Sequence, residues 1–326
     1  MANRKLKIVI GVLGLFILAA TESPAQQRDV YHVLRTVALG GDGSWDYLRF
    51  DPDSGRLFVA RSTRVMVVDV HAGKLIGEIP GTAGVHGVAL ISDLHRGVTS
   101  NGKANTATIF SLETLKPLAS VDTGEKPDSI LWDPFSKTVL TMNGHSNSIT
   151  LIDPQTAQAV ATIALPGRPE TAVTDRRGMI YVNLEDKAQI AVVDLAARTV
   201  VHTWNLTGCT EPTGLAIDLE ARRLFTGCHS GVLIAVDAET GRNIQSLPIG
   251  QGVDAVAFDP GARTVFTSNG EGSISVIEQV SADSYHNRET VQTLPGAKTL
   301  ALDTAHHLLY TVANREGSFV MLEIGR

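Results

Sequence analysis

Short hydrophobic runs recur along the chain, each bounded by Pro, Gly, Asn or Asp. Residues 128–169 show the pattern most clearly, with apolar runs at 129–132, 138–142, 148–152 and 159–165 separated by polar turns. Runs of this length that are rich in Val, Ile, Leu and Thr are typical of β-strands, and no longer stripe with a helical period interrupts them. The stretch therefore predicts a meander of four antiparallel strands.

The same four-strand unit is repeated about seven times. A polar residue that closes the third strand recurs at intervals of 41 to 45 residues, at Asp69, Ser111, Asp153, Asp194, Asp237, Glu278 and Glu323. The residue at the end of the first strand keeps the same period, at Asp51, Ile91, Asp133, Asp175, Asp218, Asp259 and Asp303. Four strands in a repeat of this length are the sequence form of a propeller blade. The sequence thus predicts an all-β fold, a seven-bladed β-propeller with four antiparallel strands per blade.

The two ends of the repeat complement each other. Residues 32–39 form one strand before the first blade, whereas the last blade has only the strands at 299–302, 308–312 and 318–323. We expect the N-terminal strand to become the outer strand of the C-terminal blade, which closes the ring and leaves no large sheet edge. With 43% hydrophobic residues in 326, the chain predicts a single propeller domain over residues 26–326.

The first 25 residues have the three-part layout of an export signal. Arg4, Lys5 and Lys7 precede an apolar run of 13 residues at 8–20. The small residues Ser23 and Ala25 lie three before and immediately before a cleavage point after Ala25. The alternative is an uncleaved membrane anchor, but the run is shorter than the roughly 20 residues that a spanning helix needs. The layout predicts a bacterial protein that is periplasmic or secreted, with no membrane span after signal cleavage.

Charge argues against one class of partner. Removal of residues 1–25 changes the net charge from −6 to −8. A nucleic-acid surface needs Lys and Arg to neutralise phosphates, so no nucleic-acid partner is expected. We also expect a monomer.

The two cysteines, Cys209 and Cys228, flank the first two strands of the fifth blade. Neighbouring antiparallel strands would bring them to the same edge of the sheet. Outside the cytoplasm this predicts a disulfide, worth roughly 3 kcal/mol for a loop of about 20 residues. A redox pair or a metal site is the alternative, but there is no CxxC motif and a zinc site needs more ligands.

Several phrases of the repeat resemble a known family. The second strand ends in TSN at 99–101, TMN at 141–143, YVN at 181–183, TSN at 267–269 and VAN at 312–314. This resembles the YVTN repeat of bacterial propellers, and GDGSWDYLRFDP at 41–52 and CTEPTGLAID at 209–218 are similar to exported YncE-like proteins. The resemblance covers the whole mature chain and implies a seven-bladed propeller outside the cytoplasm. It implies no catalytic residues.

One residue of each blade is predicted to face the mouth of the central channel. Counting five residues back from the end of each first strand gives Asp46, His86, Asp128, Glu170, Thr213, Asp254 and Lys298. Crowded carboxylates repel one another and raise each other's pKa unless a cation or hydrogen-bond donor is shared among them. A divalent metal (Ca²⁺, Mg²⁺ or Zn²⁺) bound by Asp46, His86, Asp128, Glu170 and Asp254 is one interpretation. A polar ligand site and a plain hydrated rim are the others.

Loops on the same face add Arg61, His145 and His229 as candidate ligand-binding residues. Asn101, Asn143 and Asn269 precede Gly, so we expect them mainly to tolerate left-handed backbone or to cap the loop. Arg61 and Cys228 replace this Asn in the first and fifth blades.

No nucleotide-binding, serine-hydrolase or zinc-protease motif is present. The prediction is therefore an exported binding or scaffold module that recognises a small polar ligand or a peptide or protein partner at the acidic channel mouth. The alternative is a metal-dependent lyase or lactonase at the same mouth, in which His86 or His145 moves a proton. Display of another surface, such as the connection at 278–290, to a protein partner is a third possibility.

Overall fold

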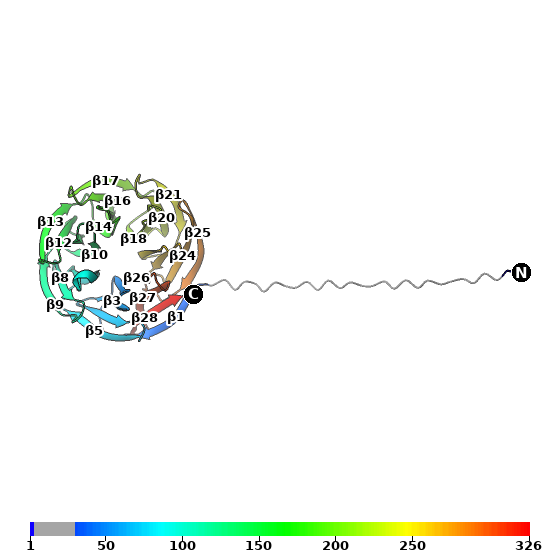
Figure 1. Cartoon of the computed structure of the whole chain (residues 1–326), viewed down its shortest axis with the longest axis horizontal. Coiled ribbons are helices and arrows are strands. Elements are labelled where there is room, and N and C mark those ends of the chain that lie inside the picture. Colours follow the sequence, from blue (N-terminus) through cyan, green and yellow to red (C-terminus); the bar gives the residue numbers. More distant parts are fainter. Residues whose placement is uncertain (3–29) are drawn as a thin grey trace.

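Seven four-stranded antiparallel sheets surround a central axis in the computed structural model (Figure 1), which describes residues 1–2 and 30–326. The prediction of a seven-bladed β-propeller is confirmed. The predicted signal peptide at 1–25, apart from its first two residues, lies outside the described residues.

Each blade runs outward from the axis through four strands, which are consecutive in the chain in the first six blades. The inner strands are β2 (Leu48–Asp51), β6 (Val85–Ile91), β10 (Pro127–Asp133), β14 (Pro169–Thr174), β18 (Pro212–Asp218), β22 (Val253–Asp259) and β26 (Leu300–Asp303). The second strands are β3 (Arg56–Arg61), β7 (Arg96–Asn101), β11 (Thr138–Asn143), β15 (Met179–Leu184), β19 (Arg223–Cys228), β23 (Thr264–Asn269) and β27 (Leu308–Arg315). The third strands are β4 (Arg64–Asp69), β8 (Thr106–Ser111), β12 (Ser148–Asp153), β16 (Gln189–Asp194), β20 (Val232–Asp237), β24 (Ser273–Ser281) and β28 (Ser318–Gly325). The outer strands are β5 (Lys74–Pro80), β9 (Pro117–Asp122), β13 (Gln158–Ala164), β17 (Thr199–Asn205), β21 (Asn243–Pro248), β25 (Ser284–Gln292) and β1 (His32–Ala38). Two short 3₁₀ turns, η1 (Ser92–Leu94) and η2 (Glu185–Lys187), lie in connections.

The N-terminal strand completes the last blade. β1 pairs antiparallel with β28 from His32 opposite Gly325 to Ala38 opposite Val320. An ion pair between Arg35 and Glu323, with 2.5 Å between Nη2 and Oε2, lies across the same junction. The predicted closure of the ring is confirmed.

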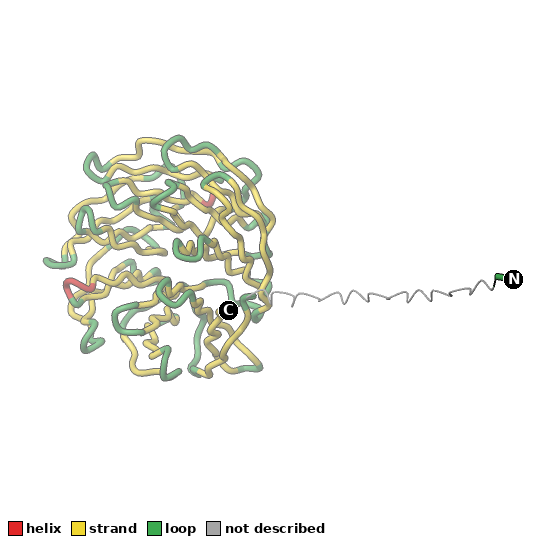
Figure 2. The backbone as a smooth tube through the Cα atoms, turned by 45° about the vertical axis from the view of Figure 1, so that its right-hand side comes forward, coloured by secondary structure: helices red, strands yellow, loops and turns green. Residues whose placement is uncertain are grey.

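The hydrophobic core lies between neighbouring sheets. Apolar side chains of the second and third strands are almost fully buried, and one cluster joins Leu140 and Ile149 of the third blade to Ile180 and Val193 of the fourth. The outer strands expose every second residue, as an amphipathic strand does. Figure 2 shows the turns and loops at the ends of the strands.

Four of the carboxylates that mark the repeat stabilise turns. Asp69, Asp153, Asp194 and Asp237 each accept hydrogen bonds from backbone N–H groups two or three residues further on, at 2.7 to 3.3 Å. Such bonds satisfy donors that the turn leaves unpaired. These acids are structural.

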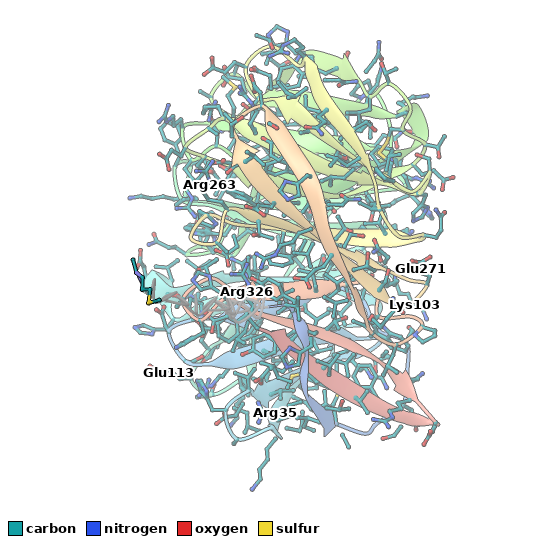
Figure 3. All side chains as sticks on the ribbon, turned by 90° about the vertical axis from the view of Figure 1, so that its right-hand side faces the viewer. Arg35, Lys103, Glu113, Arg263, Glu271 and Arg326 are labelled. Atoms are coloured by element: carbon teal, nitrogen blue, oxygen red, sulfur yellow. A yellow bond between two sulfur atoms is a disulfide. The ribbon has the colours of Figure 1, made fainter. Side chains whose placement is uncertain are left out.

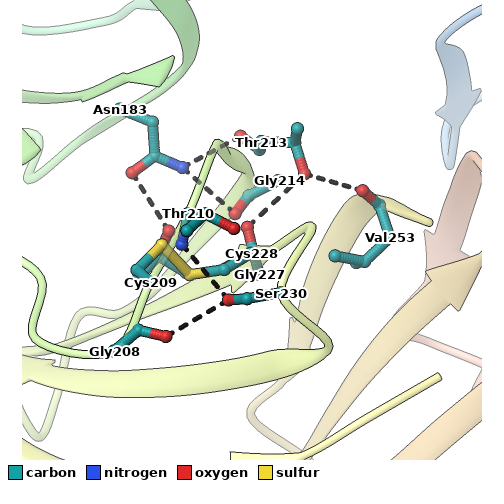
Figure 4. The surroundings of a disulfide bond; sticks show 11 residues. Asn183, Gly208, Cys209, Thr210, Thr213, Gly214, Gly227, Cys228, Ser230 and Val253 are labelled. Atoms are coloured by element: carbon teal, nitrogen blue, oxygen red, sulfur yellow. Dashed lines mark hydrogen bonds between the residues drawn. A yellow bond between two sulfur atoms is a disulfide. The ribbon is translucent and has the colours of Figure 1, made fainter. Parts of the chain in front are cut away.

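The predicted disulfide is confirmed. Cys209 and Cys228 are bonded, and their Cα atoms are 5.5 Å apart. Next to them the side chain of Asn183 donates hydrogen bonds to the carbonyl oxygens of Thr213 and Gly214 in the neighbouring blade (Figure 4). The covalent link and this contact together fix the start of β18.

Two details differ from the sequence-based expectations. The segment 278–290 is not a loop, because β24 and β25 extend through it and are joined by a tight turn at Ala282 and Asp283. The asparagines at the ends of β7, β11 and β23 are not left-handed and their side chains are buried. Asn143 accepts a hydrogen bond from Thr141 and donates to Ser148 and Thr150. Asn101 and Asn269 bond in the same way.

The ring has two distinct faces (Figure 3). Lys103 and Glu271, from loops between second and third strands, lie at one face, which we call the top face. Glu113 and Arg263, from turns between other strand pairs, lie at the opposite, bottom face. Over the residues described, no helix is long and apolar enough to cross a membrane.

Candidate functional site

Five of the predicted channel residues share a backbone irregularity at the start of their inner strands. His86, Asp128, Glu170, Thr213 and Asp254 are each the second residue of an inner strand, and the pairing register shifts at this point in all five blades. Such a bulge redirects a side chain away from the ladder. Three of these strands begin with proline, which is tolerated where no ladder N–H is needed.

Five of the predicted residues form a continuous chain of opposite charges. Lys298 Nζ lies 2.6 Å from Asp254 Oδ2 and 3.8 Å from Asp46 Oδ1. His86 Nδ1 lies 2.5 Å from Asp46 Oδ2 and 3.3 Å from Asp128 Oδ1. Lys126, which the sequence analysis missed, adds an ammonium 3.6 Å from Asp128 Oδ2. We call Asp254, Lys298, Asp46, His86, Asp128 and Lys126 the mouth charge cluster.

Electrostatics within the mouth charge cluster favour protonated His86. Burial alone would lower the pKa of His86, but the hydrogen bond with Asp46 and the negative charge of Asp128 outweigh it and raise the pKa above 6.5. Burial also opposes the charge on Lys298, yet Asp254 and Asp46 raise its pKa. Each carboxylate of the cluster thus lies beside a cation of the chain itself, although burial still raises the pKa of Asp46 above its ordinary value.

Glu170 takes no part in the charge cluster. The hydroxyl of Tyr47, in the first blade, donates a 2.8 Å hydrogen bond to Glu170 Oε1 in the fourth and lies 3.2 Å from Thr171 Oγ1. Burial raises the pKa of Glu170 well above its ordinary value, and the charges of Asp128 and Asp254 raise it further. This Tyr47–Glu170 bridge crosses the channel below the mouth. The corresponding positions of the other blades are small: Gly87, Ser129, Thr171, Gly214, Ala255 and Thr299.

A cavity of about 490 Å³ opens on the top face beside the mouth charge cluster, and we call it the top cavity. Asp46 and His86 form its inner wall, and its outer wall is made by residues of the first three blades: Trp45, Lys103, Asn105, Glu125, Lys126 and His145. Lys103, Glu125 and His145 are exposed, so the wall offers charges of both signs together with one indole ring. Of the three loop residues predicted from sequence, only His145 lines this cavity.

The other predicted residues lie elsewhere. Thr213 is buried, and its hydroxyl donates to the carbonyl oxygen of Val253 at 2.8 Å. Arg61 is also buried: it bonds the carbonyl oxygens of Gly41 and Gly43, and its Cζ lies 3.6 Å from the centroid of the Phe319 ring. His229 is exposed and pairs with Glu211, 2.9 Å away.

Three residues could hold a metal ion. Potential ligand atoms of Asp46, His86 and Asp128 all lie within 4.8 Å of one another. The other two predicted ligands have different partners, Tyr47 for Glu170 and Lys298 for Asp254. A cation at the triad would displace the proton that His86 Nδ1 shares with the carboxylates and would face the ammonium groups of Lys126 and Lys298.

Two signals in the sequence pointed to the residues that were missed. Tyr47 is the one large side chain in a set of small ones, and Lys126 stands two residues before a predicted site carboxylate. Neither residue was found by listing only one position per blade.

Comparison with known proteins places the chain in a family. A family model described as outer membrane protein assembly factor BamB matches residues 103–323. No curated protein sequence matches. Among solved structures, Kuenenia stuttgartiensis hydrazine synthase is similar with a TM-score of 0.76 at 14% identity, over 87% of this chain and 96% of that chain. A chain of a mitotic checkpoint complex is similar with a TM-score of 0.77 at 14% identity, over 97% of this chain and 99% of that one.

At that identity the two structures support the fold alone. The family model, in contrast, spans well over half of the sequence and four of its blades completely. The chain therefore belongs to the PQQ_2 family of β-propellers, the family described as outer membrane protein assembly factor BamB.

Proposed function

We propose that this protein is an exported interaction scaffold that binds an extended peptide segment of a protein partner in the top cavity. The observation that carries the proposal is the chemistry of the cavity wall, which combines Lys103, Glu125 and His145 with the indole of Trp45. A peptide carries charges of both signs, backbone donors and acceptors, and apolar side chains. A wall with the same mixture complements it better than it complements a strongly charged small ion.

The mouth charge cluster supports this preference. Its carboxylates are already paired with Lys298, His86 and Lys126, so the cluster offers a polar but nearly neutral floor. Paired charges keep their remaining lone pairs for hydrogen bonds with a ligand. The description of the family, an assembly factor, is in keeping with a protein partner.

An extracytoplasmic location is part of the proposal. The disulfide between Cys209 and Cys228 is stable where thiols are oxidised. The family description, outer membrane protein assembly factor BamB, is in keeping with such a location. The predicted signal peptide and the resemblance to exported YncE-like proteins agree with this compartment.

Site-specific photocrosslinking in the producing cell tests the proposal. A photoreactive phenylalanine analogue at position 103 or 145 is expected to capture one partner, and the same analogue at position 198 on the bottom face is the control. The charge exchange Lys103→Glu with Glu125→Lys should abolish capture from position 145, whereas Lys137→Glu on the bottom face should not. Capture at position 198 alone, or capture that the exchange leaves unchanged, would contradict the proposal.

A metal-dependent lyase or lactonase is the second candidate, favoured by the closeness of Asp46, His86 and Asp128. In it His86 acts as a ligand, which leaves His145 in the cavity wall to move a proton. A bound cation would polarise a substrate carbonyl. Elemental analysis distinguishes the two functions: a stoichiometric metal that Asp128→Asn removes and Asp122→Asn retains supports the enzyme, and metal-free wild-type protein with full partner capture rejects it.

A further inference from the structure

The bottom end of the channel carries two arginines that the top-face function does not use. Arg49 lies on the inner strand β2, two residues below Tyr47, and Arg176 lies in the turn between β14 and β15. Both line one cavity of about 600 Å³ that opens on the bottom face, which we call the lower funnel.

Arg49 breaks the pattern of its position in the repeat. The equivalent residues of the other six blades are Ala89, Leu131, Val173, Ala216, Ala257 and Ala301, all apolar. A charged side chain is therefore not required to build a blade. Its presence in one blade alone is a departure that the fold does not explain.

The two guanidinium groups make no direct polar contact within the described part of the chain. Among the described residues, neither Arg49 nor Arg176 makes a side-chain hydrogen bond or an ion pair. Both side chains are exposed to the solvent that fills the funnel. The surrounding channel wall lowers the pKa of Arg49, the charge of Asp51 opposes this, and the charge of Arg176 adds to it. The like charges of Arg49 and Arg176 therefore act on each other, and an anion held between them would relieve that repulsion.

Nearby carboxylates are engaged by other groups. Asp51 accepts hydrogen bonds from Ser54 and from the backbone of Asp53. Asp218 accepts from Gln279 and from two backbone N–H groups. Glu220 lies in a turn of the fifth blade and also lines the funnel, where its side chain is exposed. Its charge is not among the influences on the pKa of Arg49. The anion-attracting end of the funnel is therefore the side of Arg49 and Arg176.

The remaining wall is mostly apolar. Trp132, Ile217 and Phe258 are partly exposed to the lower funnel, together with Leu131, Val173 and Pro260. Above Arg49 the Tyr47–Glu170 bridge crosses the channel. A ligand would therefore enter from the bottom face and stop beneath the bridge.

We propose that the lower funnel is a second binding site that takes a small organic anion with an apolar body. A carboxylate, sulfonate or phosphate is held between Arg49 and Arg176, and an attached ring or short chain packs against Trp132, Ile217 and Phe258. Arginine suits this role because its planar group binds oxyanions in a bidentate manner. The site is independent of the top cavity.

Calorimetric titration with 2-naphthoate tests the proposal on the full-length mature protein. The neutral analogue 2-naphthylmethanol and inorganic phosphate separate the contributions of the apolar body and the charge. We expect 2-naphthoate to bind at least tenfold more tightly than either compound. Arg49→Gln and Arg176→Gln should each weaken naphthoate binding by about tenfold or more, the effect of losing one charge-assisted contact.

Matched variants keep the test decisive. Arg198→Gln removes an arginine from the same face outside the lower funnel and should leave affinity unchanged, as should Lys103→Glu on the top face. Thermal unfolding checks that Arg49→Gln is folded, and Arg49→Lys should recover part of the affinity if charge is what matters. The proposal would be overturned if 2-naphthylmethanol bound as tightly as 2-naphthoate, or if both glutamine variants bound 2-naphthoate as tightly as wild-type protein. Absence of naphthoate binding to the wild-type protein would also overturn it.

Discussion

The hydroxyl of Tyr47 lies 2.8 Å from Glu170 Oε1, although the two residues are 123 positions apart and belong to blades on different sides of the channel. Three residues of one four-residue segment, 46–49, lie at different depths of the channel. Asp46 belongs to the top cavity, Tyr47 to the bridge and Arg49 to the lower funnel. The first blade thus contributes to both cavities and to the bridge between them.

Replacement of Glu170 by Gln should stabilise the protein at neutral pH. Burial raises the pKa of Glu170 above the ordinary 4.5, so the folded state holds a proton that the unfolded state has released. The stability that this proton provides is fully present below pH 4.5 and falls as pH rises through the folded pKa. Glutamine keeps an acceptor for Tyr47 without that dependence. Urea unfolding of both proteins between pH 4 and 8 should show the advantage of Glu170→Gln growing with pH, and parallel curves would contradict the buried carboxyl.

His86 should give the protein a second pH dependence, which begins near the ordinary imidazole pKa of 6.5. Its folded pKa is raised above 6.5, because the bond with Asp46 and the charge of Asp128 outweigh the effect of burial. A raised pKa contributes stability below pH 6.5 that is lost as pH rises through the folded pKa. Chemical unfolding at pH 6 and pH 8.5 should show wild-type protein losing stability over this interval.

His86→Gln should flatten that loss, because the amide does not titrate. His71→Gln replaces an exposed histidine that forms no ion pair among the described residues, and this control should keep the wild-type slope. If His86→Gln retains the full slope, the pairing of His86 with Asp46 does not govern the titration.

The period of the chain was enough to predict the ring, its closure by residues 32–39 and the disulfide, because these follow from alternating hydrophobicity and from which strands are neighbours. It also predicted that Asp46, His86, Asp128, Asp254 and Lys298 share one mouth. The sequence did not reveal that Lys298 and Lys126 neutralise the carboxylates, since whether long side chains reach one another depends on the diameter of the channel. Arg61 lies away from the mouth for a similar reason: its length lets it bond the loop at 41–43 and cover Phe319.

The asparagines show another limit of reading a dipeptide. Asn followed by Gly suggests a turn with left-handed backbone, yet Asn101, Asn143 and Asn269 stay in strands. Each has Thr two residues before it and Ser or Thr on the next strand, and the side chains form a buried hydrogen-bonded group. The relevant pattern spans about ten residues across a hairpin, so a window of two residues misses it.

Asn143→Ala should therefore destabilise the fold. The change removes three side-chain hydrogen bonds and leaves the buried hydroxyls of Thr141 and Thr150 short of a partner. Each unsatisfied buried group costs about 1–3 kcal/mol, so we expect a loss of roughly 2–4 kcal/mol in the free energy of unfolding. Asn314, at the corresponding position of the last blade, is exposed. Asn314→Ala is the control and should change stability by less than about 0.5 kcal/mol; similar losses for both variants would show that burial is not the cause.

Closure of the ring by β1 should protect the edge of β28 from pairing with another chain. β1 pairs with β28 over most of its length and is the only partner on that side of the sheet among the described residues. A mature chain that begins at Leu39 would expose the backbone groups of β28, and an open edge of this kind pairs readily with another chain. We expect the shortened protein to form dimers or larger aggregates in size-exclusion chromatography with light scattering.

A chain that begins at Val30, which retains β1, is the control and should elute as the monomer. Addition of a synthetic peptide of residues 30–39 to the shortened protein should restore the monomer-sized species, because the peptide can occupy the vacant edge. A shortened protein that stays monomeric without the peptide would show that the ring closes through the remaining strands alone.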